Sequence, residues 1–598
     1  MHLRKMSAPA ISEKDRTYKN PVYPHSFPDP FVLKHGRDYF AYCTGIHDDG
    51  NVFGTLHSTD LVHWEEIGGA MRKLDTDAPF YWAPEVTFSS GRFYLYYSVG
   101  NETLMEIRLA VSDGPTGFSD VGSTLTHQEF AIDPHVFIDD DGQRYLFYAT
   151  DFLEHTHIGT GTVVDRMLDW DELEGSPRPV TRAMYDWQIY DPARKEKGGV
   201  RWHTVEGPFV LKRKDRYFEM FSGGNWQNTS YGVSFATSDD VLSDPEWQQF
   251  SDGENTLPIL RTTPDIIVGP GHNSVVRGPN GRELYCVYHR WTDAGRVMAI
   301  DRMDFAGDRI FVAGPTDTPQ PAPFTAKLVE SSKCISTFAD LPSSFLCEFA
   351  ATGDSDSPAG FELFAGPEKI FDYFPEAADS STDRPLFSVY TLDVDGRHLK
   401  VSIDGVAMRH LRGLLSERPD NLKIFGHANE RISVTEGFEE LFEHNTDPVE
   451  NGWKVSGEVH VENGKLTLRP SENEGLLGRE CVSGAFDLAV NLRLDVPDSN
   501  AEFGLKTVSA NGGEWRFGYS SGKLCIDGLR VEIPSLSSEI GAFAITRQLR
   551  ILALADTTQF YLDGDLVGTG ETLDGVSKFE IYCRNTGLVL DMVRLTRI

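Results

Sequence analysis

The stretch EGPFVLKRKDRYFEMFSGG, residues 206–224, decides which fold this chain is expected to adopt. It contains an apolar run, a polar turn and a second, aromatic-rich run in which polar and apolar residues alternate. This order is typical of a β-hairpin. One acidic residue, Glu206, stands directly before the first run. Taken alone, Glu206 marks either the start of a strand or a carboxylate held at the mouth of a pocket.

The same pattern occurs four more times in the first half of the chain. The copies are DPFVLKHGRDYFAYCTG (29–45), PEVTFSSGRFYLYYSVG (84–100), DPHVFIDDDGQRYLFYAT (133–150) and HNSVVRGPNGRELYCVYHR (272–290). The period of roughly 50–70 residues leaves room for four strands in each unit. Five such units predict an all-β fold, a five-bladed β-propeller over residues 1–318. The alternative is a β-sandwich whose hairpins are similar by accident.

Size and charge limit the possible partners. A chain of 598 residues is expected to form several domains. The formal net charge of −34 disfavours nucleic acid and anionic membranes, because both require a basic surface. A neutral partner such as a carbohydrate is compatible with this charge. The oligomeric state is left open.

Cysteine usage and the N-terminal residues bear on the cellular compartment. The seven cysteines show no metal-ligand spacing, and we expect them to be reduced and buried. Residues 1–20 are basic but have no apolar run, so no signal peptide is expected. No apolar stretch approaches the length of a membrane span. These observations predict a cytoplasmic protein, or a secreted one if the N-terminus has been trimmed.

The five copies, once aligned, bring ionisable residues into register. Four of them place such a residue three positions before an apolar residue of the first strand: Asp29, Asp133, Glu206 and His272. The first strand of each propeller blade lines the central channel, so equivalent positions converge around one mouth. Neighbouring like charges shift each other's pKa values, and such clusters are more often functional than structural.

Paired carboxylates on either side of a glycosidic bond can hydrolyse it. One protonates the leaving oxygen, and the other activates water or attacks directly. The acid must remain protonated near neutral pH, which burial and a nearby negative charge achieve. Aromatic platforms suit sugar faces, and four tryptophans lie near the repeat starts or inter-blade loops: Trp82, Trp187, Trp202 and Trp226.

These residues together resemble a known family. FPDPFV, WAPEV, IDPHVFIDDDG, VEGPFVLK and GPGHNSVV look like the catalytic domain of glycoside hydrolase family 43, over roughly residues 20–315. The resemblance implies an inverting hydrolase acting on arabinofuranosyl, xylosyl or sometimes galactosyl linkages. It implies that Asp29 is the general base, that Glu206 is the general acid, and that Asp133 raises the pKa of Glu206.

The resemblance also implies substrate contacts. His272 matches a family histidine on the central axis, which in many members lies by a calcium ion, a sodium ion or a water cluster. Arg296 is similar to an arginine that contacts substrate in some members, with Arg290 and Arg302 as competitors. Trp82, Glu85 and Trp226 are further expected substrate contacts. No cofactor is required for the expected reaction.

The second half of the chain differs in pattern. The Pro-rich stretch 311–324 is interpreted as a linker. Two β-sandwiches are expected beyond it, over 325–436 and 437–598, similar to the concanavalin-like jelly rolls often appended to this family. They are expected to cap the propeller, to bind polysaccharide, to support dimerisation or to reach across and shape the site.

The main hypothesis is an exo-acting glycosidase that releases arabinose or xylose from plant-type oligosaccharides. An inverting mechanism predicts that the carboxyl groups of Asp29 and Glu206 lie roughly 6.5–9.5 Å apart. Three alternatives stay open: a non-catalytic sugar-binding propeller, an endo-acting or galactan-specific member of the same family, and a phosphorylase on the same architecture.

Overall fold

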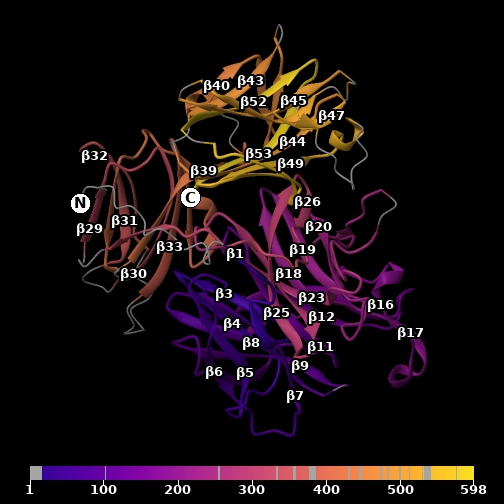
Figure 1. Ribbon diagram of the computed structural model, residues 1–598. Coiled ribbons are helices and arrows are strands. Elements are labelled where there is room, and N and C mark those ends of the chain that lie inside the picture. Colours follow the sequence, from indigo (N-terminus) through magenta and orange to yellow (C-terminus); the bar gives the residue numbers. More distant parts are fainter. Residues whose placement is uncertain are drawn as a thin grey trace.

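The computed structural model describes residues 17–598, except 102, 254–255, 331–334, 354–357, 376–385, 429–430, 444–446, 472–473, 481–483, 497, 499, 511, 521, 528, 531–539 and 574. Within these residues every regular element is a β-strand or a short 3-10 helix, which confirms the all-β prediction (Figure 1). Four cysteines are buried thiols and Cys525 is half-buried, while Cys334 and Cys481 lie outside the described residues.

Five separate sheets form the first half of the molecule, and each contains one of the predicted hairpins. The inner antiparallel pairs are β3 (Phe31–His35) with β4 (Asp38–Tyr42), β7 (Phe80–Ser89) with β8 (Arg92–Gly100), β11 (Ala131–Ile138) with β12 (Arg144–Phe152), β18 (Val205–Arg213) with β19 (Arg216–Gly223), and β23 (Val268–Arg277) with β24 (Leu284–Thr292). All five predicted hairpins are therefore present, one in each blade of a β-propeller.

Further strands complete each blade on its outer side. They are β5 (Asn51–Ser58) and β6 (Glu65–Arg72) in the first blade; β9 (Met105–Ser112) and β10 (Ser119–Thr124) in the second; β13 (Gly159–Asp169), β14 (Glu172–Leu173), β15 (Arg178–Thr181), β16 (Ile189–Arg194) and β17 (Val200–His203) in the third; β20 (Gly232–Ser238), β21 (Gln248–Gln249) and β22 (Leu260–Arg261) in the fourth; and β25 (Gly295–Ala306) and β26 (Arg309–Val312) in the fifth.

A strand from the start of the described chain, β2, closes the ring of blades. β2 (Tyr23–Ser26) pairs with β25 of the last blade, so the two ends of the propeller sequence share one sheet. Just before β2, the Asn20 side chain accepts from the backbone N–H of Ile300 at 2.9 Å and donates to its carbonyl at 2.7 Å. Pairing across the closure joins the first and last blades without a covalent link.

The Pro-rich stretch 311–324 is part of the propeller surface, which corrects its interpretation as a linker. Thr316 donates from both its backbone N–H and its hydroxyl to the buried Asp301 carboxylate. Within the same stretch, β27 (Gln320–Pro321) pairs with β1 (Thr17–Tyr18). Proline fixes backbone angles without forbidding packing, so composition alone did not distinguish a free linker from a docked connection.

Two further hydrophobic cores fill the second half. A long sheet runs through both in the order β35 (Val406–Ala407), β34 (His398–Ile403), β33 (Leu386–Asp395), β30 (Ser344–Gly353), β39 (Arg431–Glu440), β53 (Leu588–Arg597), β44 (Phe486–Leu494), β49 (Arg547–Ala553), β50 (Thr558–Leu562) and β51 (Asp565–Gly570). Its first part packs on β29 (Ile335–Ala339), β37 (Asn421–Phe425), β31 (Gly360–Ala365) and β32 (Glu368–Tyr373). Its second part packs on β40 (Lys454–Ser456), β43 (Gly475–Glu480), β52 (Val576–Arg584), β45 (Glu502–Ser509), β46 (Glu514–Ser520), β47 (Lys523–Ile526) and β48 (Leu529–Arg530).

One strand belongs to both sandwiches. The first residues of β39 pair with β30, and its last residues, from Gly437 onward, pair with β53. The expected boundary between 436 and 437 therefore falls inside a continuous strand. The division into 325–436 and 437–598 stays a proposal, with β39 as the shared element.

The sandwiches cover one end of the propeller, which we call the hairpin end because the turns of the five inner hairpins lie there. Every one of these turns contacts the second half of the chain. The contacts are Lys34 with Glu348 at 2.6 Å, the Ser90 N–H with Asp404 at 2.9 Å, Asp140 with Arg409 at 2.7 Å, Lys214 with Asp591 at 2.7 Å, and Arg282 with Asp393 at 2.7 Å. The five inner strands start at the opposite end, which we call the mouth.

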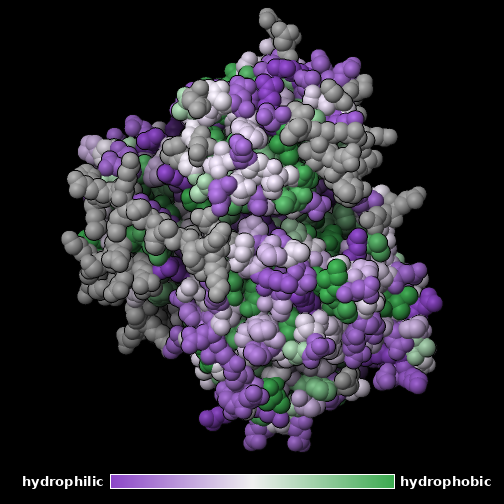
Figure 2. Space-filling view, viewed as in Figure 1, coloured by the Kyte–Doolittle hydropathy of each residue, from purple (hydrophilic) through white to green (hydrophobic). Residues whose placement is uncertain are grey.

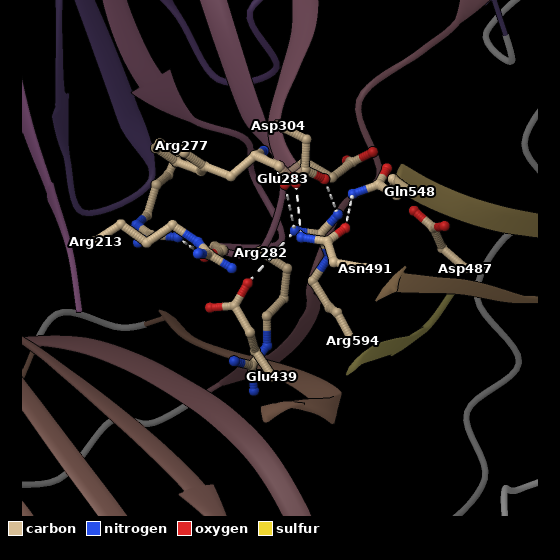
Figure 3. Close-up of polar contacts among 12 residues, drawn as sticks. Arg213, Arg277, Arg282, Glu283, Asp304, Glu439, Asp487, Asn491, Gln548 and Arg594 are labelled. Atoms are coloured by element: carbon tan, nitrogen blue, oxygen red, sulfur yellow. Dashed lines mark hydrogen bonds and ion pairs between the residues drawn. The ribbon is translucent and has the colours of Figure 1, made fainter. Parts of the chain in front are cut away.

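Buried ion pairs lie within this contact (Figure 3). Arg302 lies 3.0 Å from Glu283 of its own blade and 2.8 Å from Asp487 of the second sandwich. Arg594 of β53 bonds to Asp304 of β25. Asp487 also accepts from Arg550 at 2.7 Å. On the side of the molecule seen in Figure 2, the surface carries hydrophilic side chains interspersed with small hydrophobic patches.

Candidate active site

The five inner strands begin at the mouth with a shared backbone feature. A register shift near the start of four of them marks a β-bulge. At equivalent positions in or just before the five strands, a residue has a left-handed backbone: Asp29 (φ 53°), Ala83 (44°), Asp133 (59°), Gly207 (58°) and His272 (48°). Non-glycine residues rarely adopt this conformation, and they concentrate where surrounding structure enforces it, often at functional sites. The bulges turn these residues toward the axis.

Glu206 is not in this shared position, which corrects the sequence alignment by one residue. In the fourth blade the left-handed residue is Gly207, and Glu206 precedes it, opposite Ser222. Its counterpart in the second blade is Trp82, opposite Ser98. The bulge is common to these strands, so it does not cause the shift. The alignment slipped because Phe209, in place of Val210, was matched to the valines of the other copies, whereas Pro208 aligns with Pro30 and Pro134.

Asp29 is held as an ionised carboxylate. Its Oδ1 lies 2.8 Å from Arg296 Nη1, 3.2 Å from His289 Nδ1 and 3.5 Å from His272 Nδ1. Burial alone would raise the pKa of Asp29, but the charge of Arg296, together with the contacts to His272 and His289, outweighs burial and holds the pKa of Asp29 well below its usual range.

Asp133 and Glu206 have the opposite tendency. Burial raises the pKa of Asp133 well above its usual range, and the nearby charges of Glu206 and Asp29 raise it further. Burial also raises the pKa of Glu206 to about 7, against the hydrogen bond that Tyr231 donates to Glu206 Oε1 at 2.7 Å. The Gly207 N–H donates to Asp133 Oδ2 at 3.0 Å, which ties the two positions together. Asp133 and Glu206 therefore retain a proton as a pair near neutral pH.

The structure separates the three candidate arginines. Arg296 reaches Asp29, and its guanidinium carbon lies 4.5 Å from the ring centroid of Trp226. Arg290 instead donates to the Thr316 carbonyl, and Arg302 lies at the hairpin end with Asp487. Of the three, Arg296 is the one beside the candidate base.

The aromatic candidates lie in different settings. Trp226 is half-buried and stacks on Trp291 with ring centroids 6.0 Å apart. Trp82 is half-buried and stacks on Phe80 at 5.1 Å. Trp202 is buried. The half-buried rings of Trp82 and Trp226 remain the candidates for contact with a sugar.

Glu85 is committed to the protein interior, which does not favour its expected contact with substrate. One of its oxygens accepts from the Val136 N–H and the other contacts His135 Nδ1, both at 2.8 Å. His135 Nε2 accepts from the Val210 N–H at 2.9 Å, so the ring proton is on Nδ1 and is donated to Glu85. This relay fastens the inner strands of the second, third and fourth blades around the axis.

The space and the side chains beside His272 can be compared with what the expected calcium or sodium ion requires. A space of about 20 Å³ lies on the axis beside His272, which is room for about one water molecule. In the described part of the chain no three His, Cys, Asp or Glu side chains are grouped so as to hold a metal. The Asp29 oxygen nearest to His272 is already bonded to Arg296. These residues do not fit an ion bound directly by the protein.

Two side chains of the site escaped the sequence analysis. Tyr231 lies just before β20, and His289 lies in β24. His289 ends the fifth repeat in the dipeptide His-Arg, a signal that could have marked it. Tyr231 stands outside the repeats, so no comparison between copies could have found it.

Comparison with known proteins bears on this arrangement. The model of the glycosyl hydrolases family 43 matches residues 18–311. A β-D-galactofuranosidase from Aspergillus niger is 31% identical over 313 residues, covering 48% of this chain and 82% of the relative. The chain belongs to glycosyl hydrolase family 43. It is accordingly a glycosidase, and the non-catalytic propeller is set aside.

Other relatives in family 43 carry different names. An arabinan endo-1,5-α-L-arabinosidase B from Emericella nidulans is 26% identical, covering 33% of this chain and 56% of the relative. An extracellular exo-α-(1→5)-L-arabinofuranosidase from Streptomyces avermitilis is 23% identical, covering 47% of this chain and 58% of the relative. A solved thermostable family-43 glycoside hydrolase is 32% identical with a TM-score of 0.44, covering 52% of this chain and all of that one.

The expected cytoplasmic location is wrong. The relative from Streptomyces avermitilis and an endo-α-(1→5)-L-arabinanase from Bacillus subtilis are both named as extracellular, which points to secretion. The expectation rested on residues 1–20, most of which lie outside the described residues. Among the helices that the structure describes, none has the length and hydropathy to cross a membrane.

Proposed function

We propose that this protein is an inverting exo-glycosidase that removes terminal α-L-arabinofuranosyl or β-D-xylosyl residues from plant-type oligosaccharides. One observation carries the proposal: carboxyl groups from three blades, the buried Asp29 and Asp133 and the half-buried Glu206, lie at the mouth with opposite pKa shifts. Asp29 is held ionised, whereas Asp133 and Glu206 retain a proton. Titratable groups whose environments drive their pKa values apart are the mark of an acid and a base working together.

In the proposed reaction Asp29 is the general base. It takes a proton from a water molecule, and the water oxygen forms a bond to the anomeric carbon. Glu206 gives its proton to the glycosidic oxygen as the bond between that oxygen and the anomeric carbon breaks. Asp29 ends protonated and Glu206 ends ionised, and exchange with solvent restores both. No cofactor enters this sequence.

Asp133 acts in this proposal through Glu206. The two carboxyl groups are coupled, so ionisation of either one opposes ionisation of the other and the pair keeps a proton near neutral pH. Arg296 holds Asp29 in place, and Trp226 beneath the guanidinium supplies a flat apolar surface beside the base. We propose that Trp226 and Trp82 flank the sugar that is released.

The choice of sugar rests on the names of relatives, which include arabinofuranosidase, galactofuranosidase and xylosidase activities. Relatives named as endo-acting make internal cleavage of arabinan the second candidate. The test compares 4-nitrophenyl α-L-arabinofuranoside, β-D-xyloside and β-D-galactofuranoside with debranched arabinan. Release of monosaccharide alone supports exo-action, whereas a ladder of oligosaccharides supports the second candidate.

Stereochemistry tests the mechanism. Proton NMR of the first product formed should show the anomeric configuration opposite to that of the substrate. A product with retained configuration would contradict the assignment of Asp29 as a base, as would full activity in both Asp29→Ala and Glu206→Ala.

A further inference from the structure

We infer that Tyr231 is a positioning residue that fixes the orientation and the proton affinity of the acid Glu206, and that Gly271 exists to admit its ring. This inference rests on the proposed function, because it takes Glu206 as the proton donor. Tyr231 is 1% exposed and lies directly before β20, on the same blade as Glu206. Its hydroxyl donates to Glu206 Oε1 at 2.7 Å.

The direction of this hydrogen bond decides where the acid carries its proton. Burial and the charges of Glu206 and Asp29 raise the pKa of Tyr231 well above its usual range, so the phenol stays protonated and donates. Glu206 Oε1 must then accept, and the proton of the neutral acid is left on Oε2. Tyr231 thus selects which oxygen of Glu206 faces the leaving group with a proton.

Gly271 makes room for the phenol ring. A Cβ atom at this position would lie 2.1 Å from Tyr231 Cε1 and 2.2 Å from Cδ1, far inside van der Waals contact. The ring also stacks on His289, the cross-strand partner of Gly271, with centroids 5.7 Å apart and an interplanar angle of 8°. Gly271 and His289, on two neighbouring strands of the fifth blade, therefore form the seat of the Tyr231 ring, which we call the clamp.

The clamp also reaches the base. His289 is fully buried, and its Nδ1 lies 3.2 Å from Asp29 Oδ1. Burial lowers the pKa of His289 to about 4, so the stacked imidazole is neutral at the pH at which Glu206 is half ionised. Tyr231, which contacts Glu206, thus stacks on His289, which contacts Asp29, and the neutral imidazole adds no charge between the acid and the base.

The Tyr231→Phe variant should raise the pKa of Glu206, although it removes a hydrogen bond to this residue. The hydrogen bond from Tyr231 favours the ionised form of Glu206 and opposes the effect of burial. Tyr231→Phe removes only this donor and keeps the ring in its slot. The pKa of Glu206 should then rise, and the alkaline limb of kcat/KM should move to higher pH by ~0.5–1 unit.

The experiment measures pH profiles of wild type and Tyr231→Phe on two substrates that differ in leaving group. An arabino- or xylo-oligosaccharide needs protonation of its leaving oxygen. At pH values below the alkaline limb of wild type, kcat of the variant on this substrate should be ~10-fold lower than that of wild type. On the 4-nitrophenyl glycoside kcat should fall less than ~3-fold, because that leaving group departs readily without a proton. KM should stay within ~2-fold on both.

Tyr217→Phe is the matched control. Tyr217 is a buried tyrosine of the same blade, and its hydroxyl donates to Asp139 at 2.6 Å, but it lies toward the hairpin end. This variant should leave the alkaline limb in place. Gly271→Ala is the second test variant, and it should move the limb in the same direction as Tyr231→Phe because it displaces the same hydroxyl.

An alkaline limb of Tyr231→Phe that stays in place or moves to lower pH overturns the inference, as does an equal loss on both substrates. Glu206→Gln separates this failure from failure of the proposed function. If Glu206→Gln is inactive on the oligosaccharide and Tyr231→Phe leaves the limb unmoved, only the role of Tyr231 fails. If Glu206→Gln keeps full activity, the proposed acid itself is wrong.

Discussion

The two ends of the propeller bury the same kind of side chain and obtain opposite results. At the hairpin end, burial would raise the pKa of Asp591, but Arg213 and Lys214 hold it down to about 2. At the mouth, burial raises the pKa of Glu206 to about 7. The difference lies in the cations, since Arg296 is committed to Asp29 and no arginine or lysine in the described chain is shown bonded to Asp133 or Glu206.

This comparison shows that burial does not by itself set the charge of a carboxyl group. Buried carboxylates that meet guanidinium groups hold domains together and are costly to unpair. Buried carboxylates without such partners keep protons that a reaction can use. The catalysis proposed for the mouth and the ion pairs at the hairpin end thus draw on one residue type with different neighbours.

The largest expected effect is loss of catalysis at the mouth. Asp29→Asn and Glu206→Gln should each lower kcat/KM on oligosaccharides by about 10²–10⁴-fold, because each removes a proton transfer. Initial rates at the wild-type pH optimum give the value. Asp591→Asn is the control at the other end, and folded protein of this variant should keep its kcat. If Asp591→Asn lowered kcat as much as the variants at the mouth, the carboxyl groups at the two ends would not differ in function.

The second effect is loss of stability at the hairpin end. Asp487→Ala leaves Arg302 and Arg550 buried without their shared carboxylate. The free energy of unfolding should fall by about 3–5 kcal/mol, as for other broken buried pairs. Urea denaturation followed by tryptophan fluorescence measures this change. A drop below 1 kcal/mol would show that the network adds little to the contact between propeller and sandwich.

The third effect is a gain of stability at the mouth. Glu206 has a folded pKa of about 7, above its usual 4.5. A raised pKa stabilises the fold below pH 4.5, and this contribution is lost as pH rises through 7. Glu206→Gln does not titrate, so it should exceed wild type by about 1–2 kcal/mol at pH 8 and show a smaller difference at pH 5. A difference independent of pH would contradict the assigned shift.

The smallest effect concerns an ion pair that is open to solvent. Arg597 and Glu436 lie 2.8 Å apart, with side chains 44% and 27% exposed. Glu436→Ala should cost about 0–1 kcal/mol, and added salt should abolish even that cost. The same denaturation experiment in 0.05 and 0.5 M salt provides the measurement. A loss comparable with that of Asp487→Ala would show that burial is not what separates strong from weak pairs here.

Much of the propeller could be predicted because its signal is local and repeated. The apolar start, the polar turn and the aromatic return of the hairpin at 206–224 occur in every blade, so five weak signals support one another. Asp29 and Asp133 were found in the same way, since each precedes a proline at the same backbone bend.

What could not be predicted depends on the third dimension. The apolar pattern does not show that Gly207, and not Glu206, takes the left-handed position shared by the inner strands. Tyr231 reaches Glu206 only because Gly271 on another blade makes room for it. The partners of Arg213 and Arg282 lie far along the chain, in a region whose sequence shows strands but not which surface they will cover.

The ion pairs between the hairpin end and the sandwiches have a consequence for synthesis of the chain. The arginines leave the ribosome long before the carboxylates that neutralise them: Asp393 follows Arg282 by 111 residues, Asp487 follows Arg302 by 185, and Asp591 follows Arg213 by 378. At about 5–20 residues per second, these delays are on the order of ten seconds to a minute. During that interval the nascent propeller can already close through β2, yet its hairpin end carries unpaired positive charge. Asp591 of β53 is the last of these three carboxylates along the chain, so the contact with the hairpin end is completed only after most of the second half has been translated.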